Sequence, residues 1–184
     1  AGILEHLEPA GVHSGDSTAV IPPYSIDKEM IKEIEDKSTK LALGLNVQGL
    51  LNIQFAIKDN ELFILEANPR ASRTMPFVAK VTGNQIIKAG TLLMLGYTIN
   101  EIKDKTNYLN SSTEKIAIKK AIFPWSRFPA EDTMLGPEMK ATGEVLGIGK
   151  DFGTALNKAY AAAGVEIGDK AVSYTHLTLP TSVP

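Results

Sequence analysis

Two neighbouring segments of the chain alternate hydrophobic and polar residues with the period of a β-strand. In residues 50–58, LLNIQFAIK, large hydrophobic side chains from Leu51 to Ile57 occupy every second position. The positions between them include Asn52 and Gln54, so one face of this strand is polar. A turn signal, KDNE, separates this segment from a second strand at 62–67. The pattern predicts a half-buried β-hairpin.

Other segments repeat their hydrophobic residues at helical spacing. Residues 27–43 are the clearest case, with Asp27 as the expected N-cap and Gly44 as the expected C′ residue just after the helix. Further helices are expected in 74–82, 84–95 and 151–163.

Two more strands are expected, in 115–123 and 143–149. The first is predicted to lie at a sheet edge, because Lys119 and Lys120 would discourage further pairing. Strands and helices are mixed without a strict βαβ alternation. The order therefore favours an α+β fold, mainly an antiparallel sheet with flanking helices, over a doubly wound sheet.

Composition narrows the class of protein. The chain has 184 residues, a net charge of −2 and no cysteine. The charge argues against non-specific binding to nucleic acid, and the missing cysteines exclude disulfides and thiolate catalysis. No hydrophobic run approaches the 18 residues that suggest a membrane span. We expect a cytoplasmic protein with neither a nucleic-acid nor a membrane partner.

Polar residues are concentrated at the end of the second hairpin strand, in FILEANPRASRT at 63–74. They are Glu66, Asn68, Arg70 and Arg73. With Gln54, the acid and the amide supply oxygen ligands of the kind that Mg²⁺ prefers. Guanidinium groups bind phosphate or carboxylate oxygens. The set fits a metal–nucleotide triphosphate and an anionic second substrate. A solvated strand face with a surface ion pair is the alternative interpretation.

The metal hypothesis depends on the register of the hairpin. Gln54 and Glu66 share a face only if their paired positions have the same parity. That requires an odd loop, most simply three residues with Asn60 in the left-handed conformation. A two-residue loop would put Gln54 opposite Leu65 and turn Glu66 to the other face.

A second polar cluster lies in EPAGVHSGDS, residues 8–17. Gly11 and Gly15 allow a ligand or a backbone to approach closely, and His13, Ser14 and Asp16 surround them. A phosphate or sugar contact and a tight turn with local hydrogen bonds are equally consistent with this pattern.

Three separated blocks of the chain resemble the large subunit of carbamoyl-phosphate synthetase. They are EPAGVHSGDST, NIQFAIKDNELFILEANPRASRTMPFVAKVTG and FP…D…LGPEMKATGEVLGIGKDFGTALNKA. The blocks match in order and spacing over roughly residues 1–165. HSGDS and LGPEMKATGEV are closer to the second, carbamate-phosphorylating half of that subunit than to the first. The resemblance implies the C-terminal part of an ATP-grasp domain.

The resemblance also implies roles for individual residues. The nucleotide would contact Gly11, Val12, His13 and Ser14. Gln54, Glu66 and Asn68 would hold Mg²⁺ or Mn²⁺ beneath the ATP phosphates, with Gln54 and Glu66 also contacting the nucleotide. Arg70 and Arg73 would be catalytic residues facing the phosphoryl-transfer region.

The implied reaction makes carbamoyl phosphate from bicarbonate, ATP and ammonia, and feeds pyrimidine and arginine synthesis. A glutamine-hydrolysing subunit or domain would supply the ammonia, and the rest of the large subunit would be a further partner. The half represented here would phosphorylate carbamate. Since the family's Gly-rich loop and most of its adenine pocket lie upstream of the matching blocks, we expect this polypeptide alone to be inactive.

Beyond residue 165 the expectations change. Residues 166–170 resemble the start of a linker to a regulatory domain. Residues 171–184, AVSYTHLTLPTSVP, have no helical stripe, little charge and two prolines, and are interpreted as a non-native tail.

Two other functions remain open from the sequence. One is a different ATP-grasp ligase, such as a biotin-carboxylase-like or peptide-ligase-like enzyme, which would share the Glu-x-Asn strand end. The other is a non-catalytic fragment whose polar strand face contacts another subunit.

Overall fold

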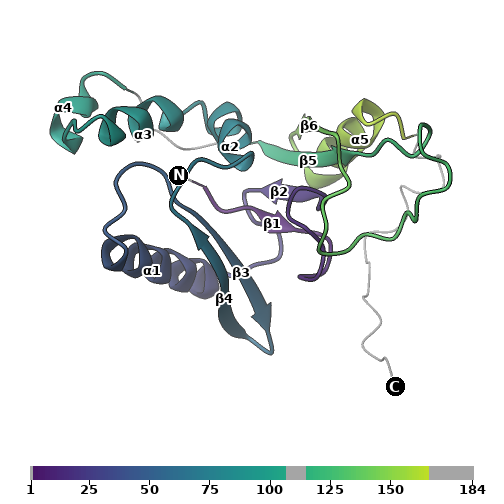
Figure 1. The fold of residues 1–184 in the computed structure, drawn as a ribbon, viewed down its shortest axis with the longest axis horizontal. Helices are drawn as coiled ribbons and strands as arrows, with labels where there is room; N and C mark the ends of the chain where they lie inside the picture. The colour runs from purple at the N-terminus through teal and green to yellow at the C-terminus, as the bar shows by residue number, and fades with distance from the viewer. Residues whose placement is uncertain (1, 107–114, 166–184) are drawn as a thin grey trace.

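The computed structural model describes residues 2–106 and 115–165 (Figure 1). Six strands and five helices occur in these ranges. They are, in chain order, β1 (Glu5–His6), β2 (Ala19–Ile21), α1 (Lys28–Gly44), β3 (Asn52–Lys58), β4 (Glu61–Asn68), α2 (Thr74–Thr82), α3 (Ile86–Met94), α4 (Ile99–Lys103), β5 (Ile116–Ile122), β6 (Gly143–Gly149) and α5 (Phe152–Ala162). Every strand pairing is antiparallel. The predicted α+β class is confirmed. The expectations for 166–170 and 171–184 lie outside the described residues.

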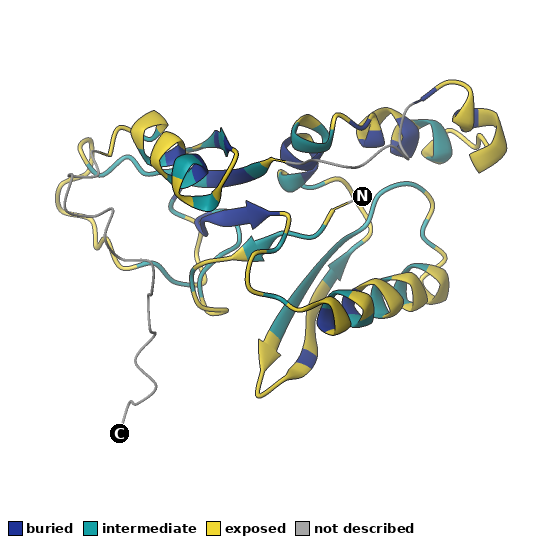
Figure 2. Cartoon of the chain, turned by 180° about the vertical axis from the view of Figure 1, so that it is seen from behind, coloured by how far each residue is buried: buried dark blue, intermediate teal, exposed yellow. Residues whose placement is uncertain are grey.

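The main sheet has four strands in the order β1-β2-β5-β6. Its two inner strands are among the most buried segments of the described residues, and Figure 2 shows them mainly in dark blue. Helix α5 packs against β5 and β6. This contact is close because Gly147 has no side chain. A Cβ added there would lie 2.1 Å from the Ala155 carbonyl oxygen.

The prediction that residues 115–123 form an edge strand is wrong. β5 pairs with β2 on one side and β6 on the other. Lys119 is buried, with an exposed fraction of 4%. A lysine can occupy an inner strand when its ammonium finds hydrogen-bond acceptors, and these come from the loop at residues 8–17.

Helix α1 begins as predicted and ends differently. The Asp27 carboxylate accepts a hydrogen bond from Met30 N (2.8 Å), which caps the first turn. Gly44 lies inside the helix, and Asn46, with φ of 48°, takes the left-handed position after it. Asn tolerates that conformation because its short polar side chain can bond locally.

The hairpin of β3 and β4 extends from the main sheet beside α1 (Figure 1). Its hydrophobic face packs on the helix through a small core of Met30, Ile34 and Leu62, with Phe55 against it. Each such side chain, when fully buried, contributes about 1.5–3 kcal/mol. The packing directs the other face of the hairpin away from α1.

Helices α2, α3 and α4 follow the hairpin. Gly83 and Gly96 take positive φ angles after α2 and α3, a backbone conformation that glycine adopts without strain. Met75, Phe77 and Val78 of α2 join Ile21 and Ala117 of the sheet in one hydrophobic core cluster. α2 therefore fixes the segment at 69–73 between the hairpin and the main sheet.

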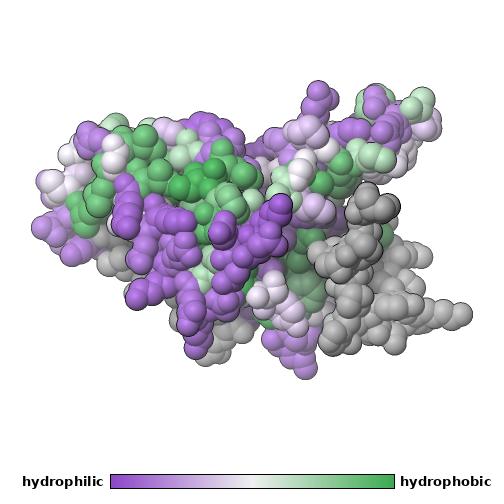
Figure 3. All heavy atoms as spheres, turned by 90° about the horizontal axis from the view of Figure 1, so that it is seen from below, coloured by the Kyte–Doolittle hydropathy of each residue, from purple (hydrophilic) through white to green (hydrophobic). Residues whose placement is uncertain are grey.

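Hydrophobic side chains also reach the surface. Leu43 and Leu45 at the end of α1 and residues 63–65 of β4 are exposed. Seen from below, Figure 3 shows a hydrophobic area bordered by hydrophilic side chains. Within the described ranges, no helix combines the length and the hydrophobicity that crossing a membrane requires.

Candidate functional site

The hairpin brings Gln54 and Glu66 directly opposite each other, but not by the predicted route. The loop has two residues, Asp59 and Asn60, both with positive φ (52° and 61°), as a type I′ turn requires. The inference that a shared face requires an odd loop is therefore wrong. Phe55 pairs with Ile64, whereas the preceding residue, Gln54, pairs with Glu66. Leu65 is therefore an extra residue, a β-bulge in β4. The bulge places Gln54 and Glu66 on the same face of the hairpin.

After the bulge, the polar side chains share the face that points away from α1. Asn68 pairs with Asn52 and lies on the same face as Glu66. The Asn68 Nδ2 atom donates to Glu66 Oε1 at 2.9 Å. The sequence prediction that Gln54, Glu66 and Asn68 project from one surface holds in this geometry.

The loop at residues 8–17 meets this face through Ser14. Gln54 Nε2 donates to Ser14 Oγ at 2.9 Å, across 40 residues of sequence. His13 Nδ1 accepts from Gly15 N at 3.0 Å, so the imidazole stabilises the turn itself. The two polar clusters that the sequence suggested separately therefore form one site. Gly11 is exposed, and Val12 N donates within the turn to Pro9 O.

A second loop, at residues 123–142, holds the first one in place. The buried Asp16 carboxylate accepts from Lys140 N and Ala141 N, both at 2.8 Å. His13 N donates to Gly136 O at 2.8 Å. Three hydrogen bonds thus join two loops that are more than 100 residues apart in the sequence.

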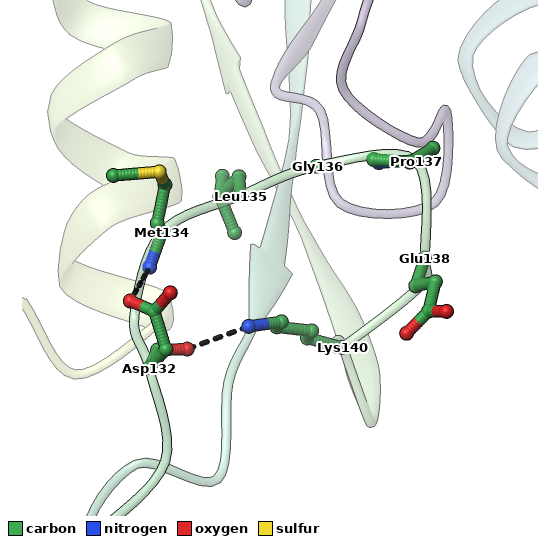
Figure 4. Close-up of a pocket in the computed structure, with 7 residues that line it drawn as sticks. All are labelled: Asp132, Met134, Leu135, Gly136, Pro137, Glu138 and Lys140. Atoms are coloured by element: carbon green, nitrogen blue, oxygen red, sulfur yellow. Dashed lines mark hydrogen bonds between the residues drawn. The ribbon is translucent and has the colours of Figure 1, made fainter.

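The same second loop encloses an open pocket of about 260 Å³ (Figure 4). Its lining residues are Asp132, Met134, Leu135, Gly136, Pro137, Glu138 and Lys140. Lys140 Nζ donates to Asp132 O at 2.6 Å and closes the loop into a ring. All of these residues belong to one loop, and none comes from the hairpin. The ring supports residues 8–17 through Gly136 and Lys140.

The two arginines differ in their surroundings. Arg73 Nη1 lies 3.1 Å from Met139 Sδ, in the loop that supports Gly15. A Cβ added to Gly15 would lie 2.7 Å from the same sulfur, so Arg73, Met139 and Gly15 are neighbours. Arg70 Nη1 donates instead to Ala71 O at 2.9 Å, within its own turn. Both guanidinium groups are exposed.

Lys119 is a member of this neighbourhood that the sequence did not indicate. Its Nζ donates to Ser14 O at 3.0 Å and lies 4.0 Å from Glu144 Oε2. Burial lowers the pKa of Lys119, and the carboxylates of Glu144, Glu8 and Asp16 oppose that shift. In the sequence, the burial of Lys119 is indicated only by its position inside an alternating hydrophobic strand. A lysine at such a position is equally typical of an edge strand.

The donor set suits a hard cation that also binds a phosphorylated ligand. Within residues 2–106 and 115–165, no group of three or more His, Cys, Asp or Glu side chains is placed to hold a metal ion. Both amide nitrogens are engaged, at Ser14 and at Glu66. Within the described ranges, no group donates a hydrogen bond to the amide oxygen of Gln54 or to that of Asn68. Mg²⁺ typically takes few protein ligands and completes its shell with phosphates and water.

Solved structures define the class of fold. The chain is similar to N5-carboxyaminoimidazole ribonucleotide synthetase in an ADP complex (TM-score 0.61, 15% identity, 87% of this chain and 43% of that one). It is also similar to the Thermotoga maritima enzyme of that name (TM-score 0.56, 15% identity, 80% of this chain and 44% of that one). These neighbours are ATP-grasp ligases, so the expected fold is confirmed.

The sequence comparisons then define the family. A model described as "Carbamoyl-phosphate synthase L chain, ATP binding domain" matches residues 4–102. The chain belongs to this family. It is 52% identical over 166 residues to the carbamoyl phosphate synthase large chain of Archaeoglobus fulgidus, which covers 90% of this chain and 15% of that one. It is 44% identical over 181 residues to the C-terminal section of the Aquifex aeolicus large chain, covering 91% and 34%. This chain therefore spans only 15–34% of the length of these relatives.

Proposed function

We propose that the chain forms part of an ATP site in the large chain of a carbamoyl-phosphate synthase, within an ATP-dependent ligase that phosphorylates carbamate. The observation that carries the proposal is the direct pairing of Gln54 with Glu66, with Asn68 bonded to the same carboxylate. Family membership supports ATP as the nucleotide. Residues 1–165 would be the C-terminal part of the ATP-grasp synthetic domain.

In this proposal the hairpin forms the floor of the phosphate site. Gln54, Glu66 and Asn68 would hold Mg²⁺ or Mn²⁺, and Gln54 and Glu66 would also approach the nucleotide. The bound cation would neutralise phosphate charge during transfer. The single carboxylate fits this task, since phosphate and water oxygens would supply the remaining ligands.

The loop at 8–17 would form one wall of the site, where Gly11, Val12, His13 and Ser14 contact the nucleotide. Ser14 is already fixed against Gln54, which supports this assignment. Arg70 and Arg73 would stabilise the transferring phosphoryl group as catalytic residues. Arg73 lies beside the loop already, whereas Arg70 would have to leave the Ala71 carbonyl.

The remaining partners follow from the proposed enzyme. Bicarbonate or carbamate would be the second substrate, and a glutamine-hydrolysing subunit or domain would supply ammonia. The 44–52% identity to proteins named as carbamoyl phosphate synthase favours this reaction over another ATP-grasp ligase. A cytoplasmic location stays a prediction.

The test uses a carbamoyl-phosphate synthase large chain that carries this sequence, assembled with its glutaminase. Glu66→Gln should lower Mg²⁺-dependent ADP and carbamoyl phosphate formation by about 100-fold or more. The fold should persist, because Glu66 is exposed. Glu61→Gln, in the same strand beside the turn, is the matched control and should keep full activity. Normal turnover of the Glu66→Gln variant would contradict the metal–phosphate site.

A further inference from the structure

Lys119 is a buried cation that the proposed ATP site does not use directly. It lies in β5, opposite Ala19 of β2 and Leu146 of β6. Its side chain is only 5% exposed. A lysine at such a position needs acceptors for its ammonium hydrogens, because an unpaired buried charge is strongly destabilising.

The acceptors of this ammonium lie in the loop at residues 8–17. Lys119 Nζ donates to the backbone carbonyl of Ser14 at 3.0 Å and to that of Gly15 at 3.4 Å. Glu144 is the nearest carboxylate, at 4.0 Å, beyond hydrogen-bond distance. The ammonium therefore ties the backbone of residues 14–15 to the centre of the main sheet.

Ser14 extends this connection to the hairpin. Its hydroxyl oxygen accepts from Gln54 Nε2 at 2.9 Å. This bond fixes the side-chain amide of Gln54 by its nitrogen, and so directs the amide oxygen elsewhere. Gln54 in turn is paired with Glu66. A continuous series of contacts thus runs from Lys119 through Ser14 to the pair that would hold the cation.

We propose that Lys119 is a positioning residue, which places the Ser14 hydroxyl so that Gln54 presents its amide oxygen to the cation beneath the ATP phosphates. The inference rests on the proposed function. Its consequence is that Lys119 sets the affinity for Mg²⁺ without touching the cation or the nucleotide. Outer partners of metal ligands typically change metal affinity by 10–100-fold when they are removed.

A purely structural role is the competing explanation, in which the ammonium only satisfies two loop carbonyls. The two explanations differ in energetic coupling. If Lys119 acts through Ser14, then removing the Ser14 hydroxyl removes the route by which Lys119 affects Mg²⁺. If Lys119 is only structural, the effects of the two changes multiply, since changes that act independently add in free energy.

The experiment is a double-mutant cycle of Lys119→Met and Ser14→Ala in the assembled enzyme. The readouts are the Mg²⁺ concentration for half-maximal ADP formation, kcat, and the thermal unfolding temperature. We expect each single variant to raise the half-saturating Mg²⁺ concentration about tenfold, and the double variant to raise it no further than the larger single effect. Methionine has nearly the shape of lysine without the charge. Should Lys119→Met deplete the folded enzyme, Lys119→Gln replaces it in the same cycle.

Lys120→Met is the matched control. Lys120 is the next residue in β5, and its Nζ donates to Thr18 Oγ1 at 3.2 Å, away from Ser14. It should leave the Mg²⁺ dependence unchanged. A double variant whose effect is the product of the two single effects would overturn the inference, as would unchanged Mg²⁺ dependence in Lys119→Met. Glu66→Gln, measured in parallel, separates the two proposals, because its full activity would defeat the ATP site itself.

Discussion

Gln54 of β3 lies directly opposite Glu66 of β4, and the β-bulge at Leu65 is what aligns them. The hairpin turn has two residues, so without the extra residue Gln54 would face position 65. The alternation of β4 changes at the bulge. Leu62 before it packs on α1, whereas Glu66 and Asn68 after it lie on the opposite, polar face.

This pairing makes Gln54 a test of the site that is independent of the carboxylate. Gln54→Met should raise the Mg²⁺ concentration for half-maximal ADP formation by about tenfold or more, because the amide oxygen and the bond to Ser14 are both lost. Titration of ADP formation with Mg²⁺ measures the change. Gln48→Met, in the exposed connection before β3, is the control. Equal Mg²⁺ dependence of the two variants would exclude Gln54 as a ligand.

Because Asn60 lies in the two-residue turn, alanine and glycine at this position should affect stability differently. Its φ of 61° is left-handed, where glycine is unstrained and alanine is not. Asn60→Ala should lower the free energy of unfolding by about 1 kcal/mol, whereas Asn60→Gly should leave it nearly unchanged. Chemical denaturation of the two variants measures the difference. Equal stability of the two would show that residue 60 is not left-handed in solution.

Because α5 packs closely on β6, replacing two glycines of this strand by alanine should cost different amounts of stability. A Cβ at Gly147 would meet backbone atoms of α5 at 2.1 and 2.5 Å, which cannot move aside without shifting the helix. Gly147→Ala should therefore cost about 3 kcal/mol of stability. Gly143→Ala, where the nearest atom is 3.8 Å away, should cost less than about 0.5 kcal/mol. Thermal unfolding distinguishes them, and similar melting temperatures would contradict this packing.

The Asp16 carboxylate connects the loop at residues 8–17 to the loop at residues 123–142, so its removal should lower stability. Its carboxylate is fully buried and accepts both backbone bonds from residues 140 and 141. Asp16→Ala should lower the free energy of unfolding by about 2–4 kcal/mol, because the buried N–H of Ala141 and the partly buried N–H of Lys140 lose their acceptors. Asp16→Asn retains one oxygen and should lose less. The exposed Asp132 supplies the control, since Asp132→Ala should change stability by less than about 1 kcal/mol. An equal loss in the Asp16→Ala and Asp132→Ala variants would argue against the loop connection.

Local sequence was enough for most elements of the fold. The N-caps Asp27 and Asp151 and the left-handed Gly83 and Gly164 were all predictable, because each depends on a few neighbouring residues. The left-handed residue after α1 is Asn46 rather than Gly44, since both residue types tolerate that conformation. The chemical types of the candidate site were also predictable from a short motif.

Tertiary structure decided how these groups meet. The bulge at Leu65 decides which face of the hairpin Glu66 occupies. The alternation of hydrophobic and polar residues does not predict such a bulge, because the extra residue has no partner in the other strand. The contact of Ser14 with Gln54 and the burial of Lys119 join segments 40 and 105 residues apart. The sequence by itself determined which side chains are available and the elements that carry them. Only the folded chain decided which of them share a face, because packing between distant segments, rather than local preference, sets register and burial.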